Sequence, residues 1–275
     1  MSRTIKVTLL GATGRLGSAI GRAVLDSPDF ELAGALVRPG SRAAGEDIGI
    51  WLIDEAIGCR AETVLEDALG EADVVIDAST PAMTAEAADQ LAVRGGPAFV
   101  SGVTGFDPVQ RARLETAARR MPVLTAGNFS LGVAVAETLV RQAAILPPED
   151  WDIEVEETHH RMKADAPSGT ALMLARAAAE ARGEDLDRIA TWSREGRTGP
   201  RQPGTIGFAV TRGGAILGEH TVRFISEMEE ISISHRAFDR TVFARGALAA
   251  ARWMVNRGSG RPAGRYTMQD VVAGG

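Results

Sequence analysis

Residues 4–17 read TIKVTLLGATGRLG, and this stretch decides the fold of the first half of the chain. Residues 4–10 predict a buried strand, and the glycine-rich turn after them leads into an amphipathic helix. In such a turn Gly11 permits the tight bend, Gly14 lets the backbone approach a pyrophosphate, and Gly17 allows the helix to pack closely on the sheet. The free N–H groups of the helix start favour phosphate. The stretch is typical of a dinucleotide-binding unit, although a GxxGxxG spacing also fits a glycine-rich turn that binds nothing.

Strands and helices then alternate as far as residue 129. Strands are expected at residues 31–37, 72–77, 98–101 and 122–125, and helices at residues 15–25, 81–93 and 108–119. This alternation predicts a Rossmann-like parallel sheet with helices on both faces. Residues 39–60 are rich in glycine and irregular, so a loop is expected there.

The pattern changes after Phe129. Helices are expected at residues 131–145, 170–182 and 241–255, a strand at 152–157, and alternating segments at 205–211, 219–225 and 230–235. The short connections between the three alternating segments predict that they pair antiparallel. We therefore expect an α/β chain with a dinucleotide-binding domain, residues 1–129 and 240–275. An α+β substrate-binding domain with a mixed or antiparallel sheet should span residues 130–239.

Composition narrows the classes of function. The formal net charge of −6 leaves no general electrostatic footprint for nucleic acid or an acidic membrane. The single cysteine, Cys59, excludes an internal disulfide and a multi-cysteine metal site, and we expect it to be buried and inert. The first ten residues lack the apolar run of a signal peptide, and no apolar stretch reaches the ~20 residues of a membrane span. We expect a cytoplasmic protein that binds no metal, nucleic acid or membrane.

Residues 157–170, ETHHRMKADAPSGT, gather cations in an acidic chain. Four residues of this motif can carry positive charge: His159, His160, Arg161 and Lys163. Ser168-Gly169-Thr170 opens the next helix, whose free N–H groups and dipole favour a carboxylate. Histidine also exchanges protons near neutral pH. These residues alone fit a site for a small polycarboxylate beside an acid catalyst, and they fit a solvated basic loop before an N-cap equally well. A metal site would need an HExxH pattern or a cysteine partner, and the motif has neither.

Two further features concern the cofactor. Residues 77–80 and 102–105 follow predicted strands, so they should line the crevice that holds the ribose and the nicotinamide amide. About 20 positions after Gly17 the chain reaches Val37, where a carboxylate would bind the ribose 2′-OH and repel a 2′-phosphate. Valine does neither, and Arg38 follows it with a cation. This turn predicts that NADPH is preferred and that NADH is also used.

The motif at residues 159–171 resembles the signature of the dihydrodipicolinate reductase family, also called 4-hydroxy-tetrahydrodipicolinate reductases. The residues that carry the resemblance are His159-His160-x-x-Lys163-x-Asp165-Ala166-Pro167-Ser168-Gly169-Thr170-Ala171. Supporting matches lie at residues 14–17, 102–106, 128–130, 193–196, 203–208 and 218–221, so the resemblance covers nearly the whole chain. Three positions depart from the family's usual residues: Leu16 replaces methionine, Ala78-Ser79-Thr80 replaces a more apolar stretch, and Val37 replaces an acidic residue in many members.

The resemblance implies that NADH or NADPH reduces a cyclic, unsaturated dicarboxylate imine to tetrahydrodipicolinate, in lysine and diaminopimelate biosynthesis. It implies that His159 is the acid/base residue and that Lys163 is a proton donor and substrate ligand. The residues that would hold the substrate carboxylates, together with Lys163, are His160, Ser168, Gly169 and Thr170. The residues that would line the cofactor are Gly11, Ala12, Thr13, Gly14, Arg15, Leu16, Gly102, Val103, Thr104, Ala126, Gly127, Asn128 and Phe129, besides Arg38 from the turn above.

The resemblance also implies a homotetramer that is built through the sheet of the substrate domain. The alternating segments carry apolar faces, such as Ile206, Phe208 and Val210, which need a cover. We expect that cover to be the same sheet of another subunit.

Two other classes of function remain as alternatives. One is a different amino-acid or semialdehyde dehydrogenase of the same fold, but Cys59 lies far along the chain from the motif at 157–170, and a thioester-forming enzyme needs a nucleophilic cysteine. The other is a nicotinamide-sensing regulator, which would need a basic helix or partner segment. His220 and His235 lie on predicted strands, where structural roles are expected.

Overall fold

The computed structural model describes residues 3–93, 95–255 and 260–274. The chain divides into two compact units, which we call unit 1 (residues 1–130 and 241–275) and unit 2 (residues 131–240). These limits lie one residue from the expected domain boundaries; of the expected dinucleotide-binding domain, residues 1–2, 94, 256–259 and 275 are outside the described residues. No helix among the described residues has the length and apolar character needed to cross a bilayer.

Unit 1 is built on a seven-stranded sheet in the order β12-β6-β5-β4-β1-β2-β3. All its strand pairs are parallel, which confirms the Rossmann-like prediction. The strands are β1 (Ile5–Leu10), β2 (Phe30–Leu36), β3 (Ala61–Glu62), β4 (Val74–Asp77), β5 (Ala98–Ser101), β6 (Pro122–Thr125) and β12 (Gly264–Tyr266). The helices are α1 (Arg15–Leu25), α2 (Ile48–Ile53), α3 (Leu65–Leu69), α4 (Pro81–Val93), α5 (Pro108–Ala118), α9 (Thr241–Val255) and α10 (Met268–Ala273).

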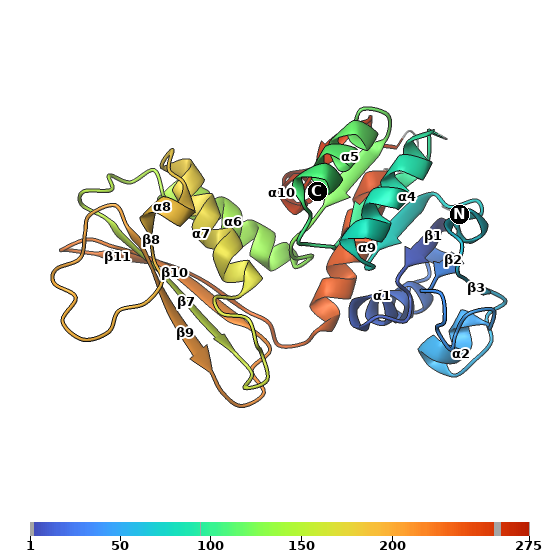
Figure 1. Cartoon of the computed structure of the whole chain (residues 1–275), viewed down its shortest axis with the longest axis horizontal. Helices are drawn as coiled ribbons and strands as arrows, with labels where there is room; N and C mark the ends of the chain where they lie inside the picture. Colours follow the sequence, from blue (N-terminus) through green and yellow to red (C-terminus); the bar gives the residue numbers. More distant parts are fainter. Residues whose placement is uncertain (1–2, 94, 256–259, 275) are drawn as a thin grey trace. The chain divides into compact units, whose positions relative to one another are not determined.

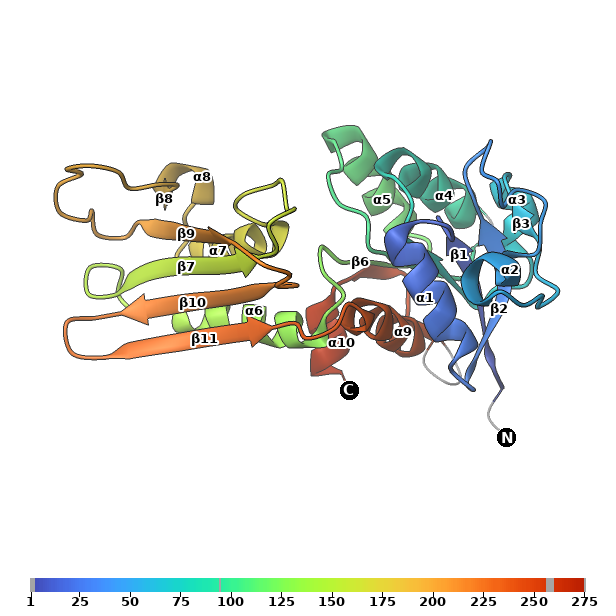
Figure 2. The ribbon, with the colours of Figure 1, turned by 90° about the horizontal axis from the view of Figure 1, so that it is seen from below.

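Helices cover both faces of the sheet in unit 1. Figure 2 shows α4 and α5 on one side of it and α1 and α9 on the other. Every residue of β4 and β5 is buried, as expected for parallel strands between two layers of helices. On the α4 and α5 side, Val75 and Phe99 of the sheet pack with Leu91 and Leu114 of these helices in one apolar core.

Residues 39–60 are not the simple loop that was expected, because they contain α2. The side chain of Asp47 caps this helix by accepting a hydrogen bond from the Gly49 N–H, at 2.8 Å. The same carboxylate accepts from the Gly58 N–H at 2.7 Å, so one side chain organises the surrounding loop. The helix has six residues. Such a short segment shows too few turns for a 3.6-residue period to be seen in the sequence.

Unit 2 contains a five-stranded sheet in the order β11-β10-β7-β9-β8, with three helices (Figure 1). Its strands are β7 (Asp152–His159), β8 (Ala190–Thr191), β9 (Ile206–Arg212), β10 (Glu219–Ile225) and β11 (Glu230–Arg236), and its helices are α6 (Leu131–Ala143), α7 (Gly169–Ala181) and α8 (Leu186–Ile189). β10 pairs antiparallel with β7 and β11, whereas β9 pairs parallel with β7 and β8. The expected antiparallel pairing of the first two alternating segments is therefore wrong: residues 213–218 carry the chain across β7, which lies between them.

The two faces of the unit 2 sheet have opposite character. Ile206 and Phe208 are 0% and 7% exposed and pack with Leu174 of α7 and Val140 of α6 in one core. The expectation that these apolar residues need another subunit as their cover is therefore wrong, because α6 and α7 of the same chain provide it; Val210 is 39% exposed.

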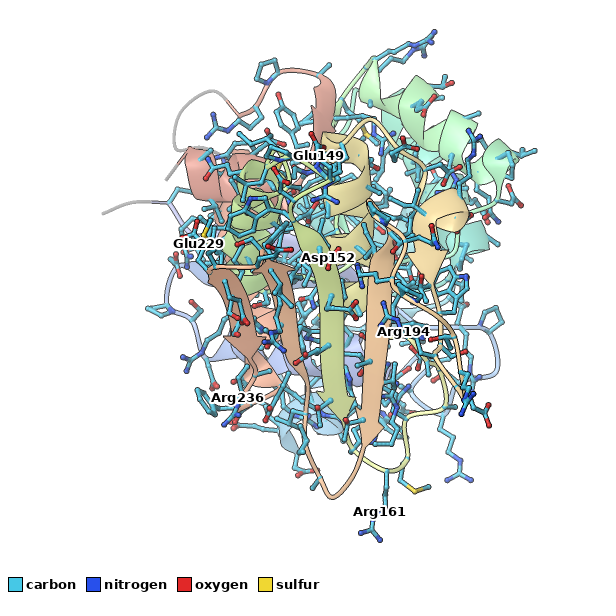
Figure 3. The ribbon with its side chains drawn as sticks, turned by 90° about the vertical axis from the view of Figure 1, so that its left-hand side faces the viewer. Glu149, Asp152, Arg161, Arg194, Glu229 and Arg236 are labelled. Carbon is cyan, nitrogen blue, oxygen red and sulfur yellow. The ribbon has the colours of Figure 1, made fainter. Side chains whose placement is uncertain are left out.

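The opposite face, which we call the open face, carries charged pairs (Figure 3). Arg194 pairs with Glu154 at 2.7 Å, Arg223 with Glu156 at 3.2 Å, and Arg236 with Glu219 at 3.0 Å. The open face is therefore a polar surface. The alternation of side chains along each strand separates it from the apolar face.

Candidate active site

The end of β7 carries two buried titratable side chains, Glu157 and His159. Every second residue of β7 is buried, so these two share the face of Ile153 and Val155, which α6 and α7 cover. Glu157 is 2% exposed and His159 is 8% exposed. The expected position of His159 in a loop is wrong, because β7 runs on through His159 and pairs it with Arg212 of β9.

Glu157 is held by three partners. Nη1 and Nη2 of Arg212 donate to its two carboxylate oxygens, both at 2.8 Å. The backbone N–H of Ser168 donates to Oε1 at 3.0 Å, and Nδ1 of His159 lies 2.5 Å from Oε2. Burial by itself would raise the pKa of Glu157, but the hydrogen bonds from Arg212 and His159 outweigh it and hold that pKa below its ordinary value. Glu157 is therefore ionised at neutral pH.

The contact with Glu157 sets the protonation of His159. An ionised carboxylate can only accept, so Nδ1 carries the hydrogen and Nε2 is left for proton exchange. A Cβ on Gly218 would lie 3.0 Å from Nε2, so the glycine leaves room beside that nitrogen. Burial, together with the charges of Lys163 and Arg212, lowers the pKa of His159 by more than Glu157 raises it. The imidazole is mainly neutral at pH 7 in the free protein.

His220 of β10 packs beside the same group. Its ring meets that of His159 edge to face, with centroids 5.0 Å apart, and its Nε2 lies 3.0 Å from Oγ of Ser168. Burial lowers the pKa of His220 to about 4, so this ring is neutral. Oγ of Ser168 also accepts from the Ala171 N–H and caps α7. His220 thus connects the proton-exchanging residue with the first turn of α7.

The other residues expected to bind substrate lie in the more exposed loop between β7 and α7. Nζ of Lys163 is 2.8 Å from both carboxylate oxygens of Asp165, and the Lys163 N–H donates to the His160 carbonyl at 3.1 Å. Asp165 is largely exposed, so a substrate carboxylate could replace it at little cost. Gly169 is exposed and nothing lies within 4 Å of the position of a Cβ there, which leaves the start of α7 open. Thr170 occupies the second position of that helix.

In unit 1 the glycine-rich turn has the geometry expected of it. Gly11 has φ +76°, and a Cβ there would lie 2.6 Å from the Ala78 carbonyl oxygen. A Cβ on Gly17 would lie 2.1 Å from the Gly11 carbonyl oxygen, so the close packing of α1 on the turn requires glycine. Gly14 is the N-cap of α1, and no side chain caps the helix. Thr13 and Arg15 are exposed, Leu16 is half-buried and Ala12 is buried. This uncapped helix start fits the pyrophosphate of a dinucleotide.

The end of β2 lies against this turn. The Leu36 carbonyl accepts hydrogen bonds from the N–H groups of Gly11 and Ala12, at 2.9 and 3.1 Å. Val37 follows and is buried, whereas Arg38 is exposed. The structure therefore brings the two residues expected to select the cofactor next to the glycine-rich turn.

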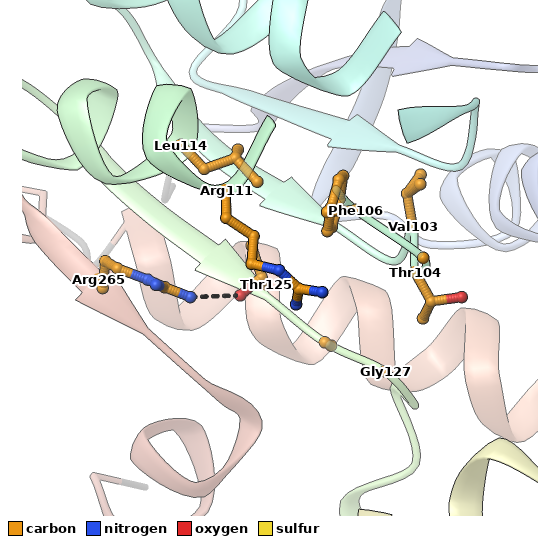
Figure 4. Close-up of a pocket in the computed structure, with 10 residues that line it drawn as sticks. Val103, Thr104, Phe106, Arg111, Leu114, Thr125, Gly127 and Arg265 are labelled. Carbon is orange, nitrogen blue, oxygen red and sulfur yellow. Dashed lines mark hydrogen bonds between the residues drawn. The ribbon is translucent and has the colours of Figure 1, made fainter. Parts of the chain in front are cut away.

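A pocket of about 320 Å³ brings together four of the expected cofactor residues, namely Val103, Thr104, Ala126 and Gly127 (Figure 4). Its lining also contains two cations that sequence reasoning missed, Arg111 of α5 and Arg265 of β12. No sequence motif marks either arginine, and Arg265 reaches this pocket only because β12 pairs with β6.

Three further expected cofactor residues have packing or turn roles. The Phe129 ring is buried against Gly102, where a Cβ would lie 2.4 Å from its Cε2. Asn128 accepts a hydrogen bond from the Ser130 N–H through its side-chain oxygen, at 2.8 Å, and so shapes the turn after β6.

Comparison with known proteins gives concordant results. Family models described as dihydrodipicolinate reductase, N-terminus and C-terminus, match residues 5–129 and 132–272. The chain is 46% identical over 273 residues to the 4-hydroxy-tetrahydrodipicolinate reductase of Caulobacter vibrioides, a match that covers 99% of this chain and 98% of the relative. It is 44% identical over 272 residues to that of Acinetobacter baumannii, covering 99% and 97%. Its fold is similar to that of a dipicolinate-bound dihydrodipicolinate reductase from Paenisporosarcina sp. TG-14, with a TM-score of 0.76 at 21% identity, covering 96% and 97% of the two chains.

Proposed function

The chain belongs to the dihydrodipicolinate reductase family, and from this we propose that it reduces 4-hydroxy-tetrahydrodipicolinate to tetrahydrodipicolinate in lysine and diaminopimelate biosynthesis. The observation that carries the proposal is His159, whose Nδ1 is held by Glu157 while its Nε2 remains available for proton exchange. The start of α7, which favours a carboxylate, is tied to the same Glu157 through Ser168.

We assign cofactor binding to unit 1 and substrate binding to unit 2. When it is bound, the nicotinamide nucleotide supplies a hydride to the substrate ring. The glycine-rich turn and the start of α1 would hold its pyrophosphate, and residues 102–104 and 126–129 would line the rest of the cofactor site. In unit 2, His160, Lys163 and the start of α7 at Ser168, Gly169 and Thr170 hold the two carboxylates of the substrate.

His159 supplies the proton that the reduced ring needs, with Lys163 as a second donor. Since the free imidazole is mainly neutral, His159 must first take up a proton. The two carboxylates of a bound substrate favour that uptake, because nearby negative charge raises the pKa of an imidazole. Substrate binding and charging of the acid are therefore linked.

We propose that NADPH is preferred over NADH. Val37 offers no carboxylate to a ribose 2′-OH, and Arg38 stands exposed beside the glycine-rich turn, where it can reach a 2′-phosphate.

We also propose a cytoplasmic homotetramer that assembles through the open face of the unit 2 sheet. The single buried thiol suits a reducing compartment, and the charged pairs of the open face offer a self-complementary surface. Light scattering should give four times the 29.0 kDa of one chain, and a monomer mass would contradict the assembly.

The test is turnover by the purified protein of freshly generated 4-hydroxy-tetrahydrodipicolinate, followed by the loss of NADPH or NADH absorbance. We expect turnover with both nucleotides. Pyridine-2,6-dicarboxylate should compete with the substrate, and the monocarboxylate pyridine-2-carboxylate should compete far less. The proposal would be contradicted if neither nucleotide supported turnover, or if the dicarboxylate and the monocarboxylate inhibited equally. Amino-acid or semialdehyde substrates in the same assay test the alternative dehydrogenase.

A further inference from the structure

Glu157 contacts both parts of the proposed site in unit 2. Its Oε2 accepts hydrogen bonds from Nδ1 of His159 and from one N–H of Arg212. Its Oε1 accepts hydrogen bonds from the Ser168 N–H and from a second N–H of Arg212. The side chain has no exposed surface, and all four contacts lie between 2.5 and 3.0 Å. One buried carboxylate thus joins the proton donor to the first turn of α7.

We propose that Glu157 is a positioning residue, which holds His159 and the carboxylate-binding start of α7 in one fixed arrangement and is itself held by Arg212. This inference rests on the proposed function and deepens it. Glu157 does not touch the substrate in this proposal, and it acts only through His159 and Ser168.

The contact with His159 decides which ring nitrogen donates the proton. Rotation of the ring about its Cβ–Cγ bond would break the contact at Nδ1 and bring a carbon to the carboxylate. The His220 ring, whose centroid lies 5.0 Å from that of His159, packs beside it and further restricts that rotation. The proton therefore leaves from Nε2, at a constant position relative to β7.

The contact with Ser168 decides where the substrate carboxylate sits. The Ser168 N–H is tied to Glu157, and Oγ of Ser168 caps α7 through the Ala171 N–H at 3.2 Å. Both ends of this residue are thus anchored before the helix begins. The start of α7 is consequently held at a set distance from His159.

Arg212 keeps the carboxylate charged and connects it to the loop that contains Lys163. Its guanidinium binds both oxygens of Glu157, and its Nη2 also donates to the Asp165 carbonyl at 2.6 Å. A lysine here could not form the same planar pair of bonds. Arg212 is therefore the second positioning residue, acting through Glu157.

Glutamine at position 157 has nearly the same shape but cannot replace this function. It has one acceptor oxygen, where the carboxylate accepts four hydrogen bonds. In either orientation its amide group would meet a donor of Arg212, and it would also meet the Ser168 N–H in the first orientation or Nδ1 of His159 in the second. In the second case the amide donates to Nδ1, and the hydrogen of the neutral ring moves to Nε2.

The experiment compares Glu157→Gln with Glu180→Gln, an exposed carboxylate on α7 that pairs with Arg141. The charged or titratable groups around His159 are Glu157 on β7, Arg212 on β9, His220 on β10 and Lys163 in the loop. Removal of the only negative charge among them lowers the pKa of the acid. For Glu157→Gln we expect a loss of about 10- to 100-fold in kcat. The fall of kcat/KM at high pH should move to lower pH by about one unit or more. Glu180→Gln should keep the wild-type profile.

A purely structural role would lower activity evenly and leave the pH at which kcat/KM falls unchanged, and that result would overturn the inference. A second measurement does not depend on any variant: ¹⁵N NMR of histidine-labelled wild type should show neutral His159 with its hydrogen on Nδ1. A hydrogen on Nε2 would overturn the inference even if Glu157→Gln fails to fold. Failure of the proposed function is separate, because it would appear as a wild-type protein that turns over no substrate, whatever the NMR result.

Discussion

Two buried carboxylates near the ends of strands, Asp77 in unit 1 and Glu157 in unit 2, have pKa values that are shifted in opposite directions. Asp77 is fully buried at the end of β4, and its described partners are hydroxyls and one N–H. Burial raises its pKa, and these neutral partners do not reverse the effect. Glu157 is almost as deeply buried, yet Arg212 and its other partners lower its pKa. Burial alone does not decide the charge of a carboxyl group, because the partners do.

The difference suits the role proposed for each unit. The hydroxyls around Asp77 come from Ser79, Thr84 and Ser101, at 2.5 to 2.8 Å. The turn after Asp77 lies against Gly11, where a Cβ would meet Ser79 Cα at 3.0 Å. The raised pKa of Asp77 makes this group easier to protonate, and a protonated carboxyl would add no repulsion toward the phosphates of a dinucleotide. Unit 2 instead needs a charge to control a proton, and it supplies the arginine that keeps the charge.

The largest effect that we predict concerns His159, the proposed proton donor, which has no counterpart in unit 1. His159→Gln should lower kcat by roughly 10²- to 10⁴-fold, the usual contribution of general acid–base catalysis. The affinity for NADPH, measured by fluorescence titration, should hardly change because His159 belongs to unit 2. An unimpaired His159→Gln enzyme would remove the proton-donor role.

The two carboxylates should also differ in what an amide replacement does to stability. Glu157→Gln should lower the free energy of unfolding by about 2 kcal/mol, because it leaves the partly buried Arg212 without its charged partner. Asp77→Asn should change it by less than about 1 kcal/mol, because the partners of Asp77 are hydroxyls and one N–H, so no charged group loses its partner. Urea unfolding of both variants at pH 7 measures the contrast. Equal losses would contradict it.

A third prediction asks whether unit 1 has one side chain whose charge matters. If Arg38 binds a 2′-phosphate, its charged hydrogen bond contributes roughly 1.5–3 kcal/mol. That corresponds to a preference for NADPH of about 10- to 100-fold in kcat/KM. Arg38→Ala should bring the ratio close to unity, and Val37→Glu should shift it toward NADH. If the wild type uses both nucleotides equally and Arg38→Ala changes nothing, Arg38 does not select NADPH through its 2′-phosphate.

The smallest effect concerns proton uptake on binding. The pKa of His159 in the free protein lies below its ordinary value of 6.5, and a bound dicarboxylate should raise it. The ligand therefore binds best at low pH, and its affinity should fall as the pH rises through the pKa of the bound state, by at most about tenfold per unit. Calorimetry with pyridine-2,6-dicarboxylate in two buffers of different ionisation enthalpy measures this uptake. Asp77→Asn should retain it and His159→Gln should abolish it; uptake that persists in His159→Gln would assign the proton to another group.

Sequence reasoning found most of the elements of unit 1 and the motif around His159, but it did not find what holds His159. One signal was present: Glu157 stands two positions before His159, and such residues share a face if the strand continues. The predicted strand ended at Glu157, so that relation was missed. Arg212 had no local signal, because its contact with Glu157 depends on the parallel register that places Thr211 beside Thr158 and Arg212 beside His159.

By itself the sequence determined the periods, turns and helix starts. Glycine spacing, apolar alternation and capping act over a few residues, and they were sufficient for the parallel sheet of unit 1 and for α7. Only the tertiary structure decided that β9 pairs with β7, that α6 and α7 cover Ile206 and Phe208, and that the pKa values of two buried carboxylates shift in opposite directions. Each of these depends on groups distant in the sequence that meet only in the folded chain. The pairing of the strands, the helices that cover the sheet and the pKa values of buried carboxylates therefore depend on burial and on partners that no local sequence pattern specifies.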